Sequence, residues 1–162
     1  MSTGTDDLMR IWKPNVTVAA VIEHEGRFLM VEEDTPEGLR LNQPAGHLEH
    51  GETLFEAVRR EVLEETAWHF EPEALVGIYL ADKPGSDITY LRFTFCGQAL
   101  REEADRRLDD GIVAAPWLTA AEIRARTRQH RSPAVALSLE DWLAGQRLPL
   151  TVIQHLTSRD KA

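Results

Sequence analysis

The sequence predicts an α/β fold in which one mixed sheet lies between layers of helix. Residues 16–22 form a continuous β-branched apolar run, which is typical of a strand covered on both faces. A capped, amphipathic helical pattern follows between residues 53 and 68. Strands, one helix, further strands and two final helices then alternate along the chain, and this order predicts a single α/β/α sandwich.

Length and composition predict one globular domain. The chain has 162 residues, of which 43% are hydrophobic and 28% are charged, and this is enough apolar material for one buried core. We expect the domain to span residues 13–156, with a loose leader at residues 1–12 and a tail at residues 157–162. The order of elements shows no internal repeat and no linker.

Charge and cysteine content exclude several classes of partner. The net charge is −9, which argues against broad binding of a nucleic-acid polymer, because that requires a basic surface. No apolar segment is long enough to span a membrane, and the N-terminus lacks the apolar region of a signal peptide. Cys96 is the only cysteine, so no intramolecular disulfide can form, and we expect Cys96 to be a small buried side chain. These features predict a cytoplasmic protein.

The first third of the chain predicts a hairpin and a glycine turn. Residues 16–22 and 28–31 are expected to pair as antiparallel strands through the turn at residues 24–27. Residues 34–40 contain a proline and a glycine and are interpreted as a loop. Residues 41–46 are expected to form a short extended piece that ends in the turn at the last of them, a glycine.

The central helix has a clear start and a clear buried face. Thr53 and Glu56 form a capping-box pattern, in which each side chain can accept a hydrogen bond from a free backbone N–H. An apolar stripe for the core recurs at Phe55, Val58 and Val62. Because Pro72 follows soon after, we expect the helix to have ended by about residue 68.

The second half of the chain supplies more strands and two helices. The expected strands are residues 75–80, 88–100 and 112–118. The expected connections are residues 82–87 and the highly charged run 101–110. The expected helices are residues 120–128 and 133–143. Ser132 and Pro133 give the second helix a favourable N-terminus, and residues 148–156 are apolar enough to pack back on the domain.

The helix carries a cluster of carboxylates that suggests a metal site. Glu61, Glu64 and Glu65 stand at i, i+3 and i+4, which places all three on one helical face, where they repel one another. A hard divalent cation would offset this repulsion, and Gly46 lets a backbone carbonyl approach the same cation. An ion pair between Glu52 and Arg60 would lock the preceding loop against the helix. The spacing alone is equally consistent with a solvent-facing helix rich in glutamate.

These residues together resemble the signature of the Nudix hydrolases. The matching positions are Gly46, Glu52, Arg60, Glu61, Val62, Glu64 and Glu65. Trp68 fits the last position loosely, and Ala67 stands where the signature has glycine, so the geometry at the helix exit is in question. The resemblance extends from about residue 12 to residue 150. Its supporting segments, at residues 42–49, 91–93, 131–133 and 145–150, are similar to the bacterial NudJ subgroup of Nudix phosphatases.

The resemblance implies a Nudix-like α/β/α sandwich and metal-dependent removal of terminal phosphate. The implied substrates are thiamin diphosphate, its hydroxymethylpyrimidine diphosphate precursor, and nucleoside di- and triphosphates. Glu61, Glu64 and Glu65, with the Gly46 carbonyl, would hold magnesium, or else manganese. Glu61 oriented by Arg60 is the expected general base, with Glu64 beside it, although the sequence does not separate a metal ligand from a base.

Other side chains are candidates for secondary roles. Asp109 or Asp110 could add a carboxylate from a later loop, because many members of the family use one, but either is equally consistent with an exposed loop acid. Arg92, His47 and Arg40 are the candidates for substrate binding, with Arg92 ranked first because it falls in the matching strand segment.

Two other functions remain open at this point. The chain could be a Nudix pyrophosphohydrolase of other specificity, acting in nucleotide-pool sanitation or on ADP-ribose. It could also be a Nudix-fold module that senses a nucleotide without turnover, although the intact Arg-Glu…Glu-Glu core counts against this. The expected partner is a small phosphorylated molecule, with no nucleic-acid polymer and no membrane, and the expected state is monomer or homodimer.

Overall fold

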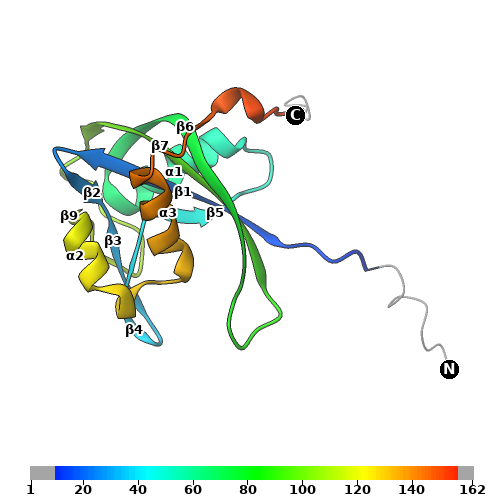
Figure 1. Cartoon of the computed structure of the whole chain (residues 1–162), viewed down its shortest axis with the longest axis horizontal. Coiled ribbons are helices and arrows are strands. Elements are labelled where there is room, and N and C mark those ends of the chain that lie inside the picture. Colours follow the sequence, from blue (N-terminus) through cyan, green and yellow to red (C-terminus); the bar gives the residue numbers. More distant parts are fainter. Residues whose placement is uncertain (1–9, 157–162) are drawn as a thin grey trace.

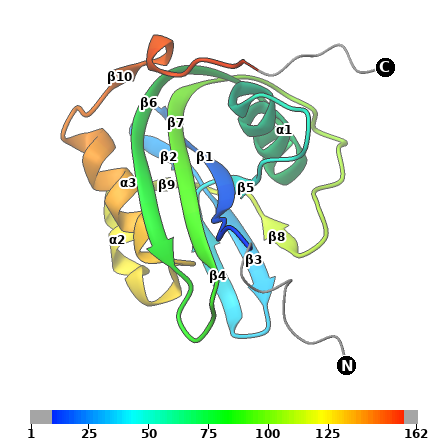
Figure 2. The ribbon, with the colours of Figure 1, turned by 90° about the vertical axis from the view of Figure 1, so that its right-hand side faces the viewer.

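The computed structural model describes residues 10–156, and it confirms the α/β sandwich. A central sheet has the strand order β10-β6-β7-β1-β2-β9, with β5 also paired to β1. Helix α1 covers one face of this sheet, and helices α2 and α3 cover the other (Figure 1; Figure 2). Of the proposed leader and tail, residues 1–9 and 157–162 lie outside the described residues.

The strands of the central sheet have these bounds: β1 Asn15–His24, β2 Arg27–Leu29, β5 Ala45–His47, β6 Trp68–Asp82, β7 Thr89–Glu102, β9 Trp117–Thr119 and β10 Leu148–Pro149. β1 runs parallel to β7 in the middle of the sheet, and β6 and β7 form a long antiparallel hairpin. β1 also turns into β2, which confirms the expected first hairpin. Because β1 is covered on both faces, Val18 to Ile22 are buried.

A second, three-stranded sheet has the order β4-β3-β8. Its strands are β3 Val31–Thr35, β4 Gly38–Asn42 and β8 Ile112–Ala114. The interpretation of residues 34–40 as a loop is therefore wrong for most of its length. Pro36 and Glu37 form only the tight turn of a hairpin in which Thr35 pairs with Gly38.

Helix α1 spans Leu54–Thr66 and packs its apolar stripe on the central sheet. Val58 and Val62 are fully buried beside Phe95 of β7, and Phe55 packs at the edge of the same cluster. The Thr53 hydroxyl accepts a hydrogen bond from the Glu56 N–H at 3.1 Å, and the Glu56 carboxylate accepts one from the Thr53 N–H at 2.9 Å. The capping box is thus formed as predicted, and it fixes where the helix begins.

Ala67 ends this helix in the left-handed conformation that glycine usually occupies. Its φ is 64° and its ψ is 10°, and its N–H donates to the Leu63 carbonyl at 2.9 Å. An L-residue pays about 1 kcal/mol for this conformation. Because the Ala67 side chain is only 4% exposed, burial of its methyl group offsets much of that cost. The departure from glycine therefore leaves the exit geometry intact.

The opposite face of the sheet is covered by α2 (Ala120–Ala125) and α3 (Pro133–Leu143). α3 has the predicted bounds, and the Ser132 hydroxyl accepts from the Ala134 N–H. α2 is shorter than predicted and is followed by a 3-10 turn at Thr127–Gln129. Val135 and Leu139 of α3 pack on a second cluster that includes the buried Cys96 thiol, as expected.

The C-terminal segment returns to α1, as predicted. After the short 3-10 turn at Leu150–Val152, Leu150 and Ile153 pack against the α1 cluster. The Leu54 N–H at the start of α1 donates to His155 Nε2 at 3.1 Å. His155 thus satisfies a backbone donor that the capping box leaves free.

Two further predictions of strand bounds are wrong. β6 begins at Trp68 and runs through Pro72, whereas the strand predicted here began only at residue 75. The strand predicted at residues 112–118 is broken into β8 and β9 at Pro116, whose carbonyl instead accepts from the Met30 N–H. Within residues 10–156, no helix combines the length and apolar character needed to cross a membrane.

Replacing Thr53 with alanine should destabilise the domain by about 1 kcal/mol, because the Glu56 N–H loses its acceptor at the start of α1. Thr53→Ser keeps the hydroxyl and should recover most of the loss. Urea unfolding followed by circular dichroism measures both changes. Equal stability of Thr53→Ala and the unmodified chain would contradict a structural role for the cap.

Candidate active site

The turn before α1 lies directly against the helical glutamates. In β5, Gly46 pairs with Val18 of β1, and any Cβ at Gly46 would overlap the Glu61 carboxylate. A larger residue at this position would therefore displace the Glu61 carboxylate, whereas the backbone makes no such demand, because the φ of Gly46 is not positive. The Ala45 N–H donates to Glu65 Oε2 at 3.0 Å. Two of the three glutamates are thus held against the backbone of one short strand.

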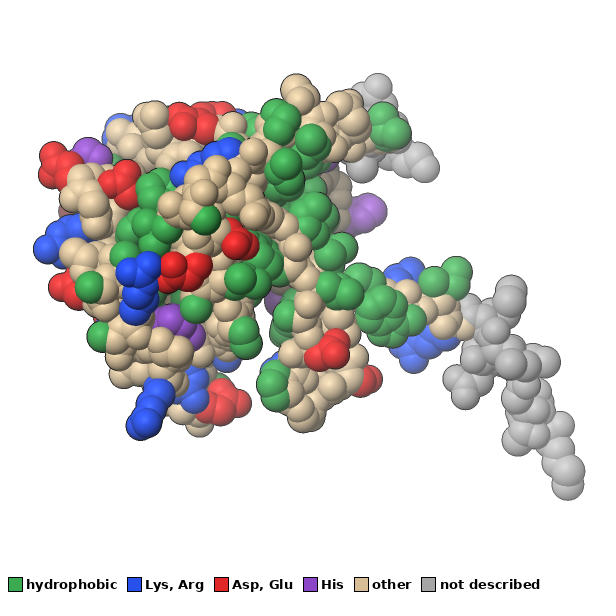
Figure 3. Space-filling view, in the orientation of Figure 1, with side chains coloured by type: hydrophobic (Ala, Val, Ile, Leu, Met, Phe, Trp, Pro, Cys, Tyr) green, Lys and Arg blue, Asp and Glu red, His purple; other side chains and the backbone are tan. Residues whose placement is uncertain are grey.

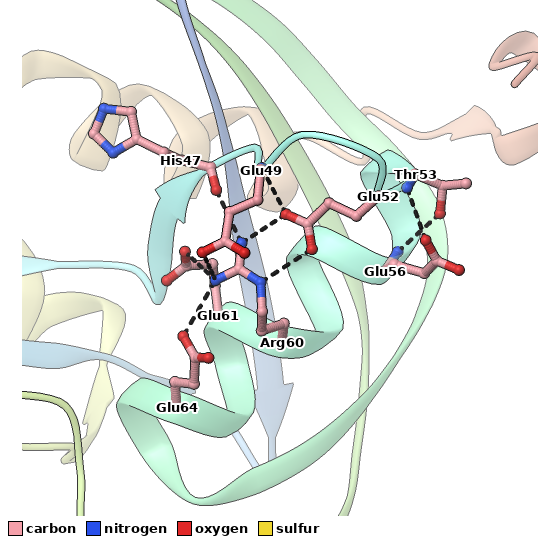
Figure 4. A network of polar contacts seen from close by, with 8 residues as sticks. All are labelled: His47, Glu49, Glu52, Thr53, Glu56, Arg60, Glu61 and Glu64. Atoms are coloured by element: carbon pink, nitrogen blue, oxygen red, sulfur yellow. Dashed lines mark hydrogen bonds and ion pairs between the residues drawn. The ribbon is translucent and has the colours of Figure 1, made fainter. Parts of the chain in front are cut away.

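Arg60 joins the loop before α1 to the acidic face of the helix (Figure 4). Its Nε and Nη2 bond the two carboxylate oxygens of Glu52 at 3.0 and 2.7 Å. Nη2 also donates to the His47 carbonyl at 2.9 Å, and Nη1 donates to Glu61 at 2.8 Å and to Glu64 at 3.2 Å. A fork of this kind recognises carboxylates with fixed geometry.

Within this network, Glu52 and Arg60 stabilise each other in the ionised state. The hydrogen bonds from Arg60 lower the pKa of Glu52 below its ordinary value, despite an opposing contribution from burial. The bond to Glu52 in turn raises the pKa of Arg60, so its charge is permanent. Glu52 and Arg60 therefore form the predicted contact between loop and helix.

Glu61 and Glu65 are buried carboxyls. They are 8% and 6% exposed, and burial raises the pKa of both. The pKa of Glu65 reaches about 9, with the charge of Glu61 adding to the effect of burial. Glu65 therefore carries a proton at neutral pH until a cation compensates its charge, and cation binding should release that proton.

One of the two candidate acids in the loop at residues 109–110 lies within electrostatic range of these glutamates. The Asp109 N–H donates to the Glu64 carbonyl at 3.0 Å, and the Asp109 charge raises the pKa of both Glu61 and Glu65. Asp110 instead pairs with Arg107 at 3.1 Å, and its side chain is 94% exposed. Of the two candidates from this loop, the structure brings Asp109 to the site.

Glu33 of β3 is a further acid that sequence reasoning missed. Its charge contributes to the raised pKa of Glu65, and burial raises its own pKa despite the Arg131 guanidinium at 3.4 Å. The sequence signal for Glu33 was weak. Residues 31–33 do not alternate between apolar and polar side chains, so they do not indicate which carboxylate is buried. The β4 pairing partner of Glu33 is Arg40, whose guanidinium donates only to the neighbouring Leu39 carbonyl at 3.3 Å.

The Arg92 guanidinium and the His47 ring make no hydrogen bond to the helical glutamates within residues 10–156, although the Glu65 charge acts on the pKa of Arg92. Arg92 is 7% exposed beneath α3, on the sheet face opposite α1, and its three acceptors are the neutral oxygens of Thr94, Asn42 and Gln43. Burial lowers the pKa of Arg92 to about 10. The His47 ring points away from Arg60 and lies edge-on to Tyr90, with centroids 6.1 Å apart (Figure 4). Substrate binding by Arg92, His47 and Arg40 stays a prediction.

The donor set suits a divalent cation of the magnesium type. Among residues 10–156, no three carboxylate, imidazole or thiol groups converge closely enough to hold a metal ion as they lie, and Arg60 engages Glu61 and Glu64. The available donors are nevertheless carboxylate oxygens, which such ions prefer. Burial disfavours the ionised form of these carboxyls, and a bound cation would offset that effect. Glu61, Glu64 and Glu65 are therefore the residues that would hold it.

Comparison with known proteins identifies the family of this chain. The family model described as the NUDIX domain matches residues 12–138. "Phosphatase NudJ" of Escherichia coli strain K12 is 39% identical over 143 residues, covering 88% of this chain and 92% of that protein. The same protein of Shigella sonnei has the same identity and coverage.

Solved structures give the same result. A NUDIX hydrolase from Nitrosomonas europaea has a TM-score of 0.86 and 51% identity, covering 92% of this chain and all of the other. A MutT NUDIX hydrolase from Burkholderia pseudomallei, at 22% identity, shares the fold with a TM-score of 0.68 over 80% of this chain and 98% of the other. The chain belongs to the Nudix hydrolase family, whose members cleave phosphoanhydride bonds.

Proposed function

We propose that this protein removes terminal phosphate from small diphosphates in a reaction that depends on a divalent cation. The observation that carries the proposal is the acidic site itself: buried Glu61 and Glu65, with Glu64 and Asp109 beside them, lie on one helix and one loop. The proposed substrates are thiamin diphosphate, hydroxymethylpyrimidine diphosphate, and nucleoside di- and triphosphates. The similarity to "Phosphatase NudJ" over 88% of the chain supports phosphate as the product.

Magnesium is the proposed cation, with manganese as a substitute. When bound, such an ion neutralises phosphate oxygens and lowers the pKa of a coordinated water. Glu64 and Glu65 would hold it with the Gly46 backbone, on the hard oxygen donors that the site presents. The chain would act on a small soluble substrate in the cytoplasm.

Glu61 is the proposed general base. Burial raises its pKa toward neutrality, which makes a carboxylate a better proton acceptor than Glu52, whose pKa is lowered. Arg60 donates to Glu61 Oε1 at 2.8 Å, and this bond fixes the orientation of the carboxylate. Because Arg60 is itself locked by Glu52, the two side chains act as positioning residues for Glu61.

A phosphate-release screen tests the function. We expect phosphate from thiamin diphosphate and nucleoside diphosphates with magnesium, and no release in excess EDTA. Parallel assays with added inorganic pyrophosphatase separate phosphate from diphosphate as the product. Cleavage of ADP-ribose alone would favour a pyrophosphohydrolase of other specificity. Nucleotide binding without any hydrolysis would favour the sensing module.

Substituting the glutamates tests the metal assignment. Glu64→Gln and Glu65→Gln should each lower kcat by about 100-fold or more, because each removes a charge that compensates the cation. Glutamine resembles the protonated carboxyl that Glu65 carries without metal, so Glu65→Gln should keep the melting temperature. Calorimetric titration with manganese should show weaker binding.

The matched control for these variants is Glu71→Gln. Glu71 pairs with Arg59 on the surface, where such an ion pair contributes little. Its activity and its metal affinity should equal those of the unmodified chain. Full activity of Glu64→Gln and Glu65→Gln with magnesium would refute the metal site.

The two loop acids provide an internal comparison. Asp109→Asn should lower kcat/KM by about 10-fold, because the Asp109 charge acts on the buried glutamates, whereas its backbone bond to Glu64 is kept. Asp110→Asn should have no effect, since that side chain is exposed and faces Arg107. Identical kinetics for the two variants would show that this loop has no part in the reaction.

A further inference from the structure

A buried arginine that the proposed reaction does not use lies beneath α3. At the surface of α2 and α3, arginine pairs with glutamate, as Arg124 does with Glu140 at 2.7 Å, and Figure 3 shows basic and acidic side chains side by side over these helices. Arg92 differs, because within residues 10–156 it makes no ion pair with a carboxylate. Its three acceptors are neutral side-chain oxygens, at 3.1 Å on Thr94, 3.3 Å on Asn42 and 2.7 Å on Gln43.

Stability alone does not account for this arginine. Removing a charge from water is costly, and an apolar side chain of similar volume often fills such a site without loss of stability. A guanidinium does offer what an apolar side chain lacks, which is a rigid array of donors. The question is therefore what the array holds in place.

Arg92 fixes the direction of the Gln43 amide. Because a guanidinium only donates, the amide oxygen must face Arg92, and the amide nitrogen then faces away from it. That nitrogen donates to the Val135 carbonyl of α3 at 2.9 Å. Gln43 is only 2% exposed, so both bonds are sheltered from water. The Gln43 side chain is thus held between β7 and α3.

The backbone after Gln43 carries this constraint to the glutamate cluster. Pro44 has a fixed φ and favours an extended Gln43, so few free torsions separate the Gln43 side chain from the peptide group between Pro44 and Ala45. The carbonyl of that peptide accepts from the Ala20 N–H of β1 at 3.0 Å. The N–H of the same peptide donates to Glu65 Oε2 at 3.0 Å. A shift of Gln43 would therefore displace an N–H that holds Glu65.

We propose that Arg92 is a positioning residue, which acts through the Gln43 amide and the Pro44–Ala45 peptide to hold the Glu65 carboxylate in place for its cation. The inference rests on the proposed role of Glu65 as a metal ligand. In this role Arg92 touches neither the cation nor the substrate. Loss of the link should therefore weaken metal binding and slow turnover, and it should leave substrate affinity nearly unchanged.

Two buried substitutions test the link. Arg92→Lys keeps the charge but loses the fork of donors, and Gln43→Met keeps a side chain of similar length but loses the amide. Each should lower kcat and weaken manganese binding by about 10-fold, with KM at saturating magnesium changed by no more than about two-fold. The measurements are steady-state kinetics with the best substrate of the phosphate-release screen and calorimetric titration with manganese. A raised KM with kcat kept would overturn the proposal, because it would place Arg92 at the substrate.

The double variant and a matched control sharpen this test. Arg92→Lys combined with Gln43→Met should lower kcat no further than either change alone, because both remove the same link. Effects that multiply to about 100-fold would show two independent roles and would overturn the proposal. The control is Gln146→Met, whose amide also donates to a backbone carbonyl, that of Val76, at 2.7 Å. Because β7 and β1 separate the Val76 strand from β5, this control should keep kcat and manganese affinity.

Amide hydrogen exchange in the metal-free chain gives a readout that does not depend on activity. In both single variants the Ala45 amide should exchange at least about 10-fold faster, because the peptide that bonds Glu65 is freed. The reference is the Ala57 amide, which donates within α1 to the Thr53 carbonyl at 2.9 Å and should change much less. Equal acceleration of both amides would show only a loss of global stability and would overturn the proposal.

Two further features keep the outcome decisive. Circular dichroism checks the fold, and Gln43→Met, which leaves Arg92 with its Asn42 and Thr94 acceptors, decides the proposal even where Arg92→Lys does not fold. If the unmodified chain releases phosphate from no substrate, the proposed function fails. Manganese binding and Ala45 exchange still decide, in that case, whether Arg92 positions Glu65.

Discussion

The active site depends on one guanidinium. Arg60 contacts Glu52, Glu61, Glu64 and the His47 carbonyl, so a single side chain joins the loop, the strand end and the helix. Without it, the carboxylates at i, i+3 and i+4 would face one another with nothing to offset their repulsion. A bidentate arginine also fixes direction, which a lysine point charge does not. The arrangement of the acids is therefore set before any substrate arrives.

Arg60 does not neutralise the whole cluster. Glu65 lies deeper, against the Ala45 N–H, and its pKa of about 9 reflects burial with no cation in contact. The carboxylates of Glu52, Glu61 and Glu64 are thus bonded to a permanent internal cation, whereas Glu65 is left for an external one. The carboxylates differ in this way because Arg60 lies one helical turn before Glu64, whereas Glu65 faces β5. An exchangeable charge at Glu65 is what a metal-dependent reaction requires.

Local patterns predicted the helix and its contacts well. The capping box at Thr53, the bounds of α3 and the pairing of Glu52 with Arg60 all depend on residues close in sequence, where spacing determines geometry. The sequence left the helix exit at Ala67 in question, and the structure shows that this alanine takes the left-handed conformation.

The strands were harder to predict, because their partners are distant. Pro72 was interpreted only as a sign that the helix had ended, yet it lies within β6, at an irregularity where the register shifts before Ala74. The partner there is Gly97, and a Cβ at that position would overlap the Glu71 carbonyl. A glycine 25 residues away thus makes room for a bulge that tolerates proline. The sequence near Pro72 does not indicate this bulge. In the same way, Glu33 joins the site only through the fold of β3.

Residues outside the signature also hold the turn at residues 45–46 in place. Gln43 accepts from Arg92 at 2.7 Å and donates to the Val135 carbonyl of α3 at 2.9 Å. Two residues later, Ala45 gives its N–H to Glu65. The segment before β5 is therefore tied on one side to α3 and on the other to the catalytic helix. Because Arg92 keeps its charge among neutral acceptors, at a cost in desolvation, the link is more than apolar packing. Contacts on the opposite face of the sheet thus help to maintain the geometry of the signature residues.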